Sequence, residues 1–188
     1  MAYVEPKDLI QLKPRWQPWP LSERVEAALQ VTGFPTNVRQ SALAITLVEQ
    51  PGKIPNGNCC GIMSQGAYKP WGWTKQVMAP VGYVMLKEGQ TGKMSPFLAF
   101  SSPAESLWVL IERVCPRRIL SGNAYASYKH TIAGNQYLGW VGLDPRDPKF
   151  GRSAKAFDVA LAKVKKAWEN STGEFCEGWM DAGIGGKA

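Results

Sequence analysis

The feature that most constrains this chain is an uncharged, apolar stretch that ends in a single carboxylate. Residues 41–48 carry no charge, Asn37 before them is a good helix N-cap, and Pro51 shortly after them stops a helix. These signals predict a buried helix over residues 37–49, with Glu49 as its last residue. Because a helix this apolar has to be enclosed, the rest of the fold must pack around it.

Glu49 is expected on the face of that helix that meets the core. Val38, Ala42, Ile45 and Glu49 are spaced 4, 3 and 4 residues apart, so they share one helical face. A carboxylate on an apolar face loses hydration, which raises its pKa and keeps it protonated near neutral pH. The spacing therefore predicts that Glu49 is a general acid. The alternative is a helix that frays before Glu49 and leaves an ordinary solvated carboxylate.

Composition narrows the class of protein. With 188 residues, 45% of them hydrophobic and 20% charged, the chain suits one globular domain with a real core. The net charge of +7 favours an anionic partner such as nucleic acid, a membrane surface or an acidic wall polymer. The first residues lack the layout of a signal peptide, and the apolar runs are too short to span a bilayer.

The cysteines and the single histidine argue against metal chemistry. The four cysteines form no C-x-x-C pair, and only His130 could join them, so we expect neither a metal site, nor a Cys–His nucleophile, nor a cofactor. Adjacent cysteines match each other poorly, so Cys59 and Cys60 would each pair with Cys115 or Cys176 if disulfides form. Buried free thiols are the default, and disulfides remain open for a protein outside the cytosol.

The chain divides into an arm, a domain and a tail. Residues 1–21 are rich in proline and tryptophan and predict an extended arm, which either packs on its own domain or docks onto a larger assembly. Residues 22–180 form the domain, and residues 181–188 a flexible glycine-rich tail. No internal repeat interrupts the domain.

Within the domain, local signals place further elements. A helix begins at Ser22 and ends at Gly33, and loops rich in glycine and proline follow the Glu49 helix. Residues 82–100 predict a β-hairpin whose turn spans residues 88–92. Two more helices are expected, one opened by a Ser102–Glu105 capping box and one over residues 153–168, with short helices and turns across residues 120–150 between them.

Three segments in this order carry a family resemblance. They are the helix that ends in Glu49, residues 57–63 (Gly-Asn-Cys-Cys-Gly-Ile-Met) and residues 97–106 (Phe-Leu-Ala-Phe-Ser-Ser-Pro-Ala-Glu-Ser). Together they resemble the glucosaminidase family of peptidoglycan hydrolases (glycoside hydrolase family 73), part of the lysozyme-like superfamily. The family ends a helix in its catalytic glutamate, and the resemblance covers residues 22–115.

The resemblance implies an α+β, mainly α fold: a lysozyme-like helical domain with a small β-hairpin lobe. It implies cleavage of the β-1,4 glycan backbone of the bacterial cell wall, by an endo-β-N-acetylglucosaminidase, a muramidase or a lytic transglycosylase. Glu49 would be the general acid, and Glu88, the only carboxylate of the hairpin, the second catalytic group. Aromatic residues that either bind sugar rings or pack internally are Tyr68, Trp71, Trp73, Tyr137 and Trp140.

Departures from the family pattern support a second hypothesis. Residues 50–52 are Gln-Pro-Gly where the family has Gly-Trp-Gly, and Glu88 lies at the hairpin turn instead of within the first strand. Residues 140–145 stand where the family has a tyrosine followed by Thr-Asp-Pro. These changes fit a structural virion or assembly protein that keeps a lysozyme-like fold without catalysis.

Partners follow from the two hypotheses. A hydrolase would bind peptidoglycan glycan strands, and without a signal peptide it would reach the wall on a bacteriophage virion, held by other virion proteins through the arm. No membrane span is expected. Nucleic-acid binding is a third reading of the positive charge, but the basic residues are dispersed and match no binding motif, so it is not expected.

Overall fold

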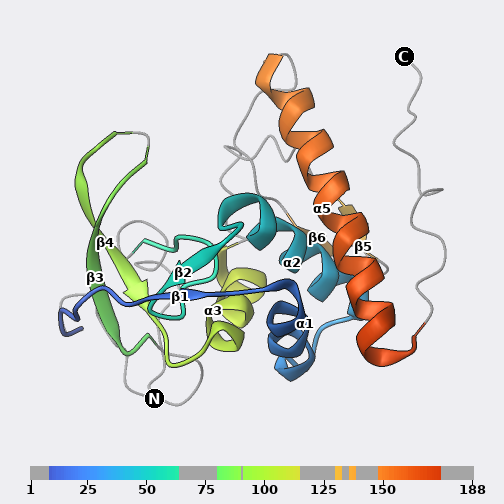
Figure 1. The fold of residues 1–188 in the computed structure, drawn as a ribbon, viewed down its shortest axis with the longest axis horizontal. Coiled ribbons are helices and arrows are strands. Elements are labelled where there is room, and N and C mark those ends of the chain that lie inside the picture. Colours follow the sequence, from blue (N-terminus) through green and yellow to red (C-terminus); the bar gives the residue numbers. More distant parts are fainter. Residues whose placement is uncertain are drawn as a thin grey trace.

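The computed structural model of the protein describes residues 9–63, 80–89, 91–114, 130–132, 136–138 and 148–174, and shows a helical body beside a β-hairpin (Figure 1). The helices are α1 (Leu21–Gln30), α2 (Thr36–Glu49), α3 (Pro103–Val109), which continues as the π-helical turn η2 (Leu110–Val114), and α5 (Pro148–Thr172). The strands are β1 (Trp16–Pro18), β2 (Lys53–Pro55), β3 (Gly82–Lys87), β4 (Met94–Ala99), β5 (His130–Ile132) and β6 (Gln136–Leu138). The expected mixture of helix and strand is confirmed.

Helix α2 lies in the core, as its composition requires. Every residue from Gln40 to Thr46 is buried, and α2 packs against α1 and α5. The α5 face predicted to be apolar is buried throughout, which satisfies the 3.6-residue period of an amphipathic helix. Its members are Phe157, Ala160, Leu161, Val164 and Trp168.

The strands form two-stranded antiparallel sheets. In the hairpin, β3 pairs with β4 so that Val84 lies opposite Phe97. The second pair joins β1 to β2, and the third joins β5 to β6. Strands β5 and β6 lie in residues 120–150, where short helices and turns were expected. That expectation was wrong for β5 and β6, because three-residue segments such as His-Thr-Ile and Gln-Tyr-Leu are too short to show a strand period and depend on their pairing.

Residues 9–20 of the N-terminal arm are part of the fold. Its Leu12 N–H donates to Tyr83 O at 2.8 Å and its Ile10 O accepts from Tyr83 N–H at 3.0 Å, so it extends the hairpin by a parallel bridge at β3. Further along, the arm becomes β1 and pairs with β2. Trp19 at its end is 1% exposed, whereas Trp16 is 53% exposed. Residues 9–20 therefore connect the hairpin to the helical body (Figure 1).

Several helices begin or end at other residues than the sequence predicted. Helix α1 begins at Leu21, with the extended Pro20 in the N-cap position instead of Ser22, and α2 begins at Thr36 instead of after Asn37. Helix α5 is longer at both ends, because a proline is tolerated in the first turn of a helix and Gly173, at φ 71°, supplies the left-handed stop. Among the described residues, no helix combines the length and apolarity needed to cross a bilayer. The 181–188 tail lies outside the described residues.

Candidate active site

Glu49 is the last residue of α2, as predicted, but its side chain is exposed. Val38, Ala42 and Ile45 on the same face are at most 2% exposed, so the helix leaves the core within its final turn. The helix does not fray, because Gln50 N–H still donates to Thr46 O at 2.8 Å. The expected loss of hydration at Glu49 is therefore wrong for the unliganded protein: the carboxylate lies on a rigid helix end, in contact with water.

The end of α2 is held by Arg24 of α1, a residue that the sequence analysis missed. Its side chain is fully buried, and its terminal nitrogens donate to Thr46 Oγ1 at 3.0 Å and to Gln50 O. Its Nε donates to Trp19 O at 2.9 Å. Arg24 thus bonds to Thr46 within α2 and to Gln50 just after it, on both sides of Glu49 in the sequence. The sequence signal was an arginine inside the apolar stripe of α1, beside Val25.

Burial governs the electrostatics of Arg24. Desolvation lowers the pKa of its guanidinium to about 10, and the nearby Cys59 sulfur acts in the opposite direction. At neutral pH Arg24 is still a cation. Hydrogen bonds to backbone and hydroxyl oxygens, together with the face of Trp19, replace the water that it has lost.

The loop after β2 ties α2 to the hairpin and to α3. The fully buried Asn58 carboxamide donates to Ile62 O and Leu98 O, both at 2.9 Å, and accepts from Ile62 N–H at 2.9 Å. Gly57, at φ 71°, has no room for a side chain, because a Cβ would lie 2.7 Å from Phe100 O. Residues 57–63, one of the three segments that carry the family resemblance, therefore have a structural role: they fix the loop to β4.

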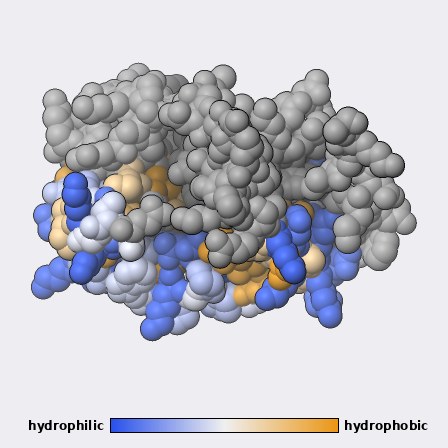
Figure 2. All heavy atoms as spheres, turned by 90° about the horizontal axis from the view of Figure 1, so that it is seen from above, coloured by the Kyte–Doolittle hydropathy of each residue, from blue (hydrophilic) through white to orange (hydrophobic). Residues whose placement is uncertain are grey.

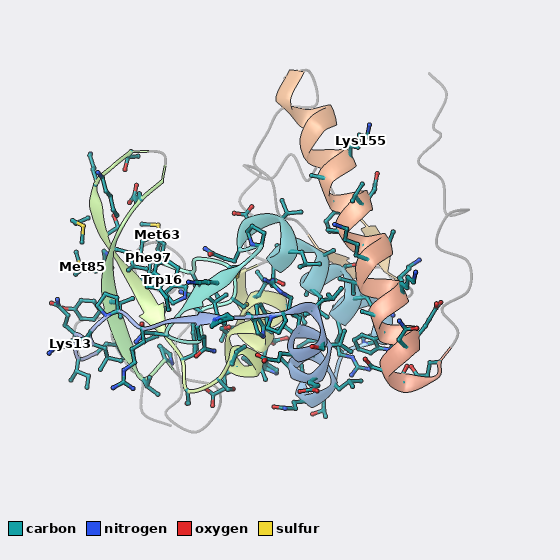
Figure 3. The ribbon with its side chains drawn as sticks, viewed as in Figure 1. Lys13, Trp16, Met63, Met85, Phe97 and Lys155 are labelled. Atoms are coloured by element: carbon teal, nitrogen blue, oxygen red, sulfur yellow. The ribbon has the colours of Figure 1, made fainter. Side chains whose placement is uncertain are left out.

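The hairpin faces the end of α2 across Gly61. The position of a Cβ on Gly61 lies 3.5 Å from Gln50 Nε2 and 3.7 Å from Phe97 Cε1, so these two side chains flank it. Met63 bridges to Phe97, and bridge partners project on one side of a sheet. In Figure 3 the labels of Met63, Phe97 and Trp16 lie on the side of the hairpin towards β2, while Met85 lies on the outer side.

Glu88 follows β3 at the turn of the hairpin. Its carboxylate accepts hydrogen bonds from Ser95 Oγ and Thr91 Oγ1, and these bonds, Ser95 first, lower its pKa. Ser95 and Phe97 are two residues apart in β4, so they share a face. Glu88 therefore carries its charge on the hairpin face that also holds Phe97, nearer the tip, and is ionised at neutral pH.

Most of the other predicted site residues lie in parts of the chain that the structure does not describe. Tyr68, Trp71, Trp73 and Trp140 lie outside the described residues, as do Cys115 and Cys176. Tyr137 lies in β6, paired with Thr131 in the β5–β6 ladder.

The described surface offers no obvious metal centre. Within the described ranges, no group of three or more histidine, cysteine, aspartate or glutamate side chains could hold a metal ion. Figure 2 shows hydrophilic side chains projecting along the described edge of the molecule, with apolar residues between them. Hydrophilic and apolar side chains thus alternate along this described edge.

Comparison with protein families, with curated proteins and with solved structures found no match for this chain.

Proposed function

We propose that the protein is a peptidoglycan hydrolase of lysozyme-like fold, with Glu49 as its general acid. The proposal rests on the position of Glu49, which is exposed at the end of a buried helix. Arg24 donates hydrogen bonds to Thr46, before Glu49 in the sequence, and to Gln50, after it. Immobilising a proton donor on a rigid element is what general acid catalysis requires.

The exposure of Glu49 leaves its carboxylate accessible to a glycan strand. A glycan strand lying over the end of α2 would displace water from the carboxylate, and loss of hydration raises the pKa of an acid. The proton would then be delivered to the leaving oxygen of the glycosidic bond, a contribution of about a hundred- to ten-thousand-fold in rate. Substrate binding, not the free fold, would supply the desolvation.

Glu88 suits the complementary role. Its lowered pKa keeps it as a carboxylate, which positions water or offsets the positive charge that develops on the sugar. If Glu88 lies too far from the reacting bond, the N-acetyl group of the substrate would assist instead, or cleavage would follow a lytic transglycosylase course with Glu49 as both acid and base.

Aromatic residues would bind the glycan. Sugar rings present apolar C–H faces, which rest on flat side chains. The proposed contacts are Tyr68, Trp71, Trp73, Tyr137 and Trp140. The net charge of +7 would favour encounter with anionic wall material. A bacteriophage particle would carry the enzyme to the wall.

The test compares Glu49→Gln with Glu26→Gln, which changes an exposed carboxylate on α1. Purified wild-type protein and the Glu26 variant should release reducing ends or anhydro sugars from peptidoglycan. The rate of release by Glu49→Gln should be lower by about a hundredfold or more. Circular dichroism and thermal unfolding of all three proteins check that the fold is unchanged. Full activity of Glu49→Gln would refute the assignment.

A second candidate is a non-catalytic structural protein of a virion, and the N-terminal arm favours it. The described part of the arm pairs with the domain yet leaves Trp16 53% exposed, which suits a contact with another protein. This function predicts no lysis in a zymogram of folded wild-type protein. It also predicts oligomers that Trp16→Ala dissociates.

A further inference from the structure

Cys59 and Cys60 are adjacent thiols whose sulfur atoms touch. Consecutive side chains in an extended strand point to opposite sides, which is why neighbouring cysteines match poorly. Here the turn that begins at Asn56 brings both side chains to one side, and the two Sγ atoms lie 3.8 Å apart. Both are buried, unbridged cysteines. In the folded protein the two sulfurs are therefore already neighbours, and the remaining obstacle to a disulfide is the peptide that joins the two residues.

The turn holds this arrangement with bonds to distant elements. Cys59 N–H donates to Ser106 Oγ of α3 at 3.1 Å, and that hydroxyl donates to Gly57 O at 2.7 Å. The carboxamide of Asn58 fixes the same turn to Ile62 and to Leu98 of β4. The contact between the sulfurs is therefore a property of the packed core and is lost when the chain unfolds.

The two cysteines differ in their neighbours and in their exposure. The buried cation of Arg24 interacts electrostatically with Cys59. Cys60 is 5% exposed and Cys59 is not exposed at all, so Cys60 offers the first point of attack.

We propose that Cys59 and Cys60 form a reversible dithiol–disulfide site that a low-molecular-weight disulfide, such as glutathione disulfide, oxidises. The Cys60 thiolate attacks one sulfur of glutathione disulfide, which forms a mixed disulfide and releases one glutathione thiolate. The Cys59 thiolate then attacks Cys60 Sγ and expels the second glutathione. Two cysteine thiols are oxidised, one glutathione disulfide is reduced to two glutathiones, and these take up the two protons.

Closing the bond would strain the junction around it. The sulfurs must move from 3.8 Å to about 2.05 Å apart, and the peptide between Cys59 and Cys60 must twist to allow this. The Cys59 N–H bond to Ser106 is next to that peptide, so oxidation would alter the contact between the turn and α3. The site would report the redox state of its compartment whether or not the protein is a hydrolase.

The experiment incubates the native full-length protein with glutathione disulfide and glutathione at fixed ratios, then alkylates the remaining thiols. Trypsin releases residues 54–75, which contain Cys59 and Cys60 and no other cysteine. We expect this peptide to escape alkylation and to be lighter than the reduced peptide by the mass of two hydrogens. Reduction should restore both thiols. A Cys115→Ser/Cys176→Ser variant should behave in the same way.

Matched controls separate the native geometry from simple proximity in sequence. Cys59→Ser should stop at the glutathione adduct of Cys60, because no second thiol is there to displace glutathione. In denaturant, the step in which Cys59 displaces glutathione from Cys60 should be at least about tenfold slower than in the native protein, since the turn no longer holds the two sulfurs in contact. Three outcomes would overturn the proposal: a peptide that stays reduced, glutathione adducts as the end product, or a bond from this pair to Cys115 or Cys176.

Discussion

The guanidinium of Arg24 lies over the ring of Trp19, with its central carbon 4.3 Å from the ring centroid. The same side chain donates to Trp19 O through Nε and to Gln50 O beyond the end of α2. A backbone hydrogen bond links the same two segments, because Trp19 N–H donates to Gly52 O at 3.1 Å. One buried cation thus joins the arm, α1 and the residues that flank Glu49.

Replacing Arg24 should destabilise the protein strongly. Arg24→Met keeps much of the volume but leaves the buried oxygens of Trp19, Thr46 and Gln50 without their donor. Each such loss costs about 1–3 kcal/mol, so we expect a fall of about 3–5 kcal/mol in the free energy of unfolding, measured by urea denaturation. The exposed Arg15→Met should change it by less than about 0.5 kcal/mol. Equal effects of the two variants would contradict the structure.

The two ordered tryptophans of the arm should differ sharply. Trp19→Ala removes a side chain that is 1% exposed and should cost about 3–5 kcal/mol. Trp16→Ala removes one that is 53% exposed and should cost less than about 1 kcal/mol. Thermal unfolding of both variants checks this. A large loss of stability for Trp16→Ala would mean that the arm packs differently.

Gly82 should tolerate no side chain, because the arm passes directly over it. A Cβ at this position would lie 2.6 Å from Ile10 O, so Gly82→Ala should displace the arm from β3 and cost about 1–3 kcal/mol. Hydrogen exchange at the Leu12 and Tyr83 amides should then accelerate. Gly89→Ala is the control, since nothing lies within 4 Å of its Cβ position.

Glu88 should make the hairpin sensitive to acid. Its pKa in the folded protein lies below the ordinary value of 4.5, chiefly because of the bond from Ser95. The stabilisation is therefore complete above the unfolded pKa and is lost as the pH falls through the lowered, folded pKa. Unfolding measured from neutral to acidic pH should show wild type above Glu88→Gln at neutral pH and the two converging in acid. A constant difference would show that the charge of Glu88 is not involved.

Local signals predicted the elements that depend on neighbours in sequence. The helix ending at Glu49, strand β3 and the Ser102 cap were found because periodicity, turn residues and capping act over a few residues. The capping bond is present, with Ser102 Oγ accepting from Glu105 N–H at 3.3 Å. These features needed no tertiary information.

Features that depend on distant residues were not predictable in the same way. The exposure of Glu49 depends on where α2 leaves the core, and its helical periodicity alone placed it on the buried face. The role of Arg24 depends on the end of α2, and the contact of Cys59 with Cys60 depends on anchors from α3 and β4. In each case the deciding partner lies far away in the sequence.

The pairing of the arm sets an order for folding during synthesis. Arg15 bonds to Asn56, 41 residues later, and Gln11 bonds to Tyr83, 72 residues later. The arm is therefore synthesised before either partner. Closing such long loops carries an entropic cost that grows with their length. Residues 10–12 can pair only after β3 has been made, whereas β1 pairs with the earlier strand β2, so the arm can dock from its Trp19 end towards its start as the chain emerges.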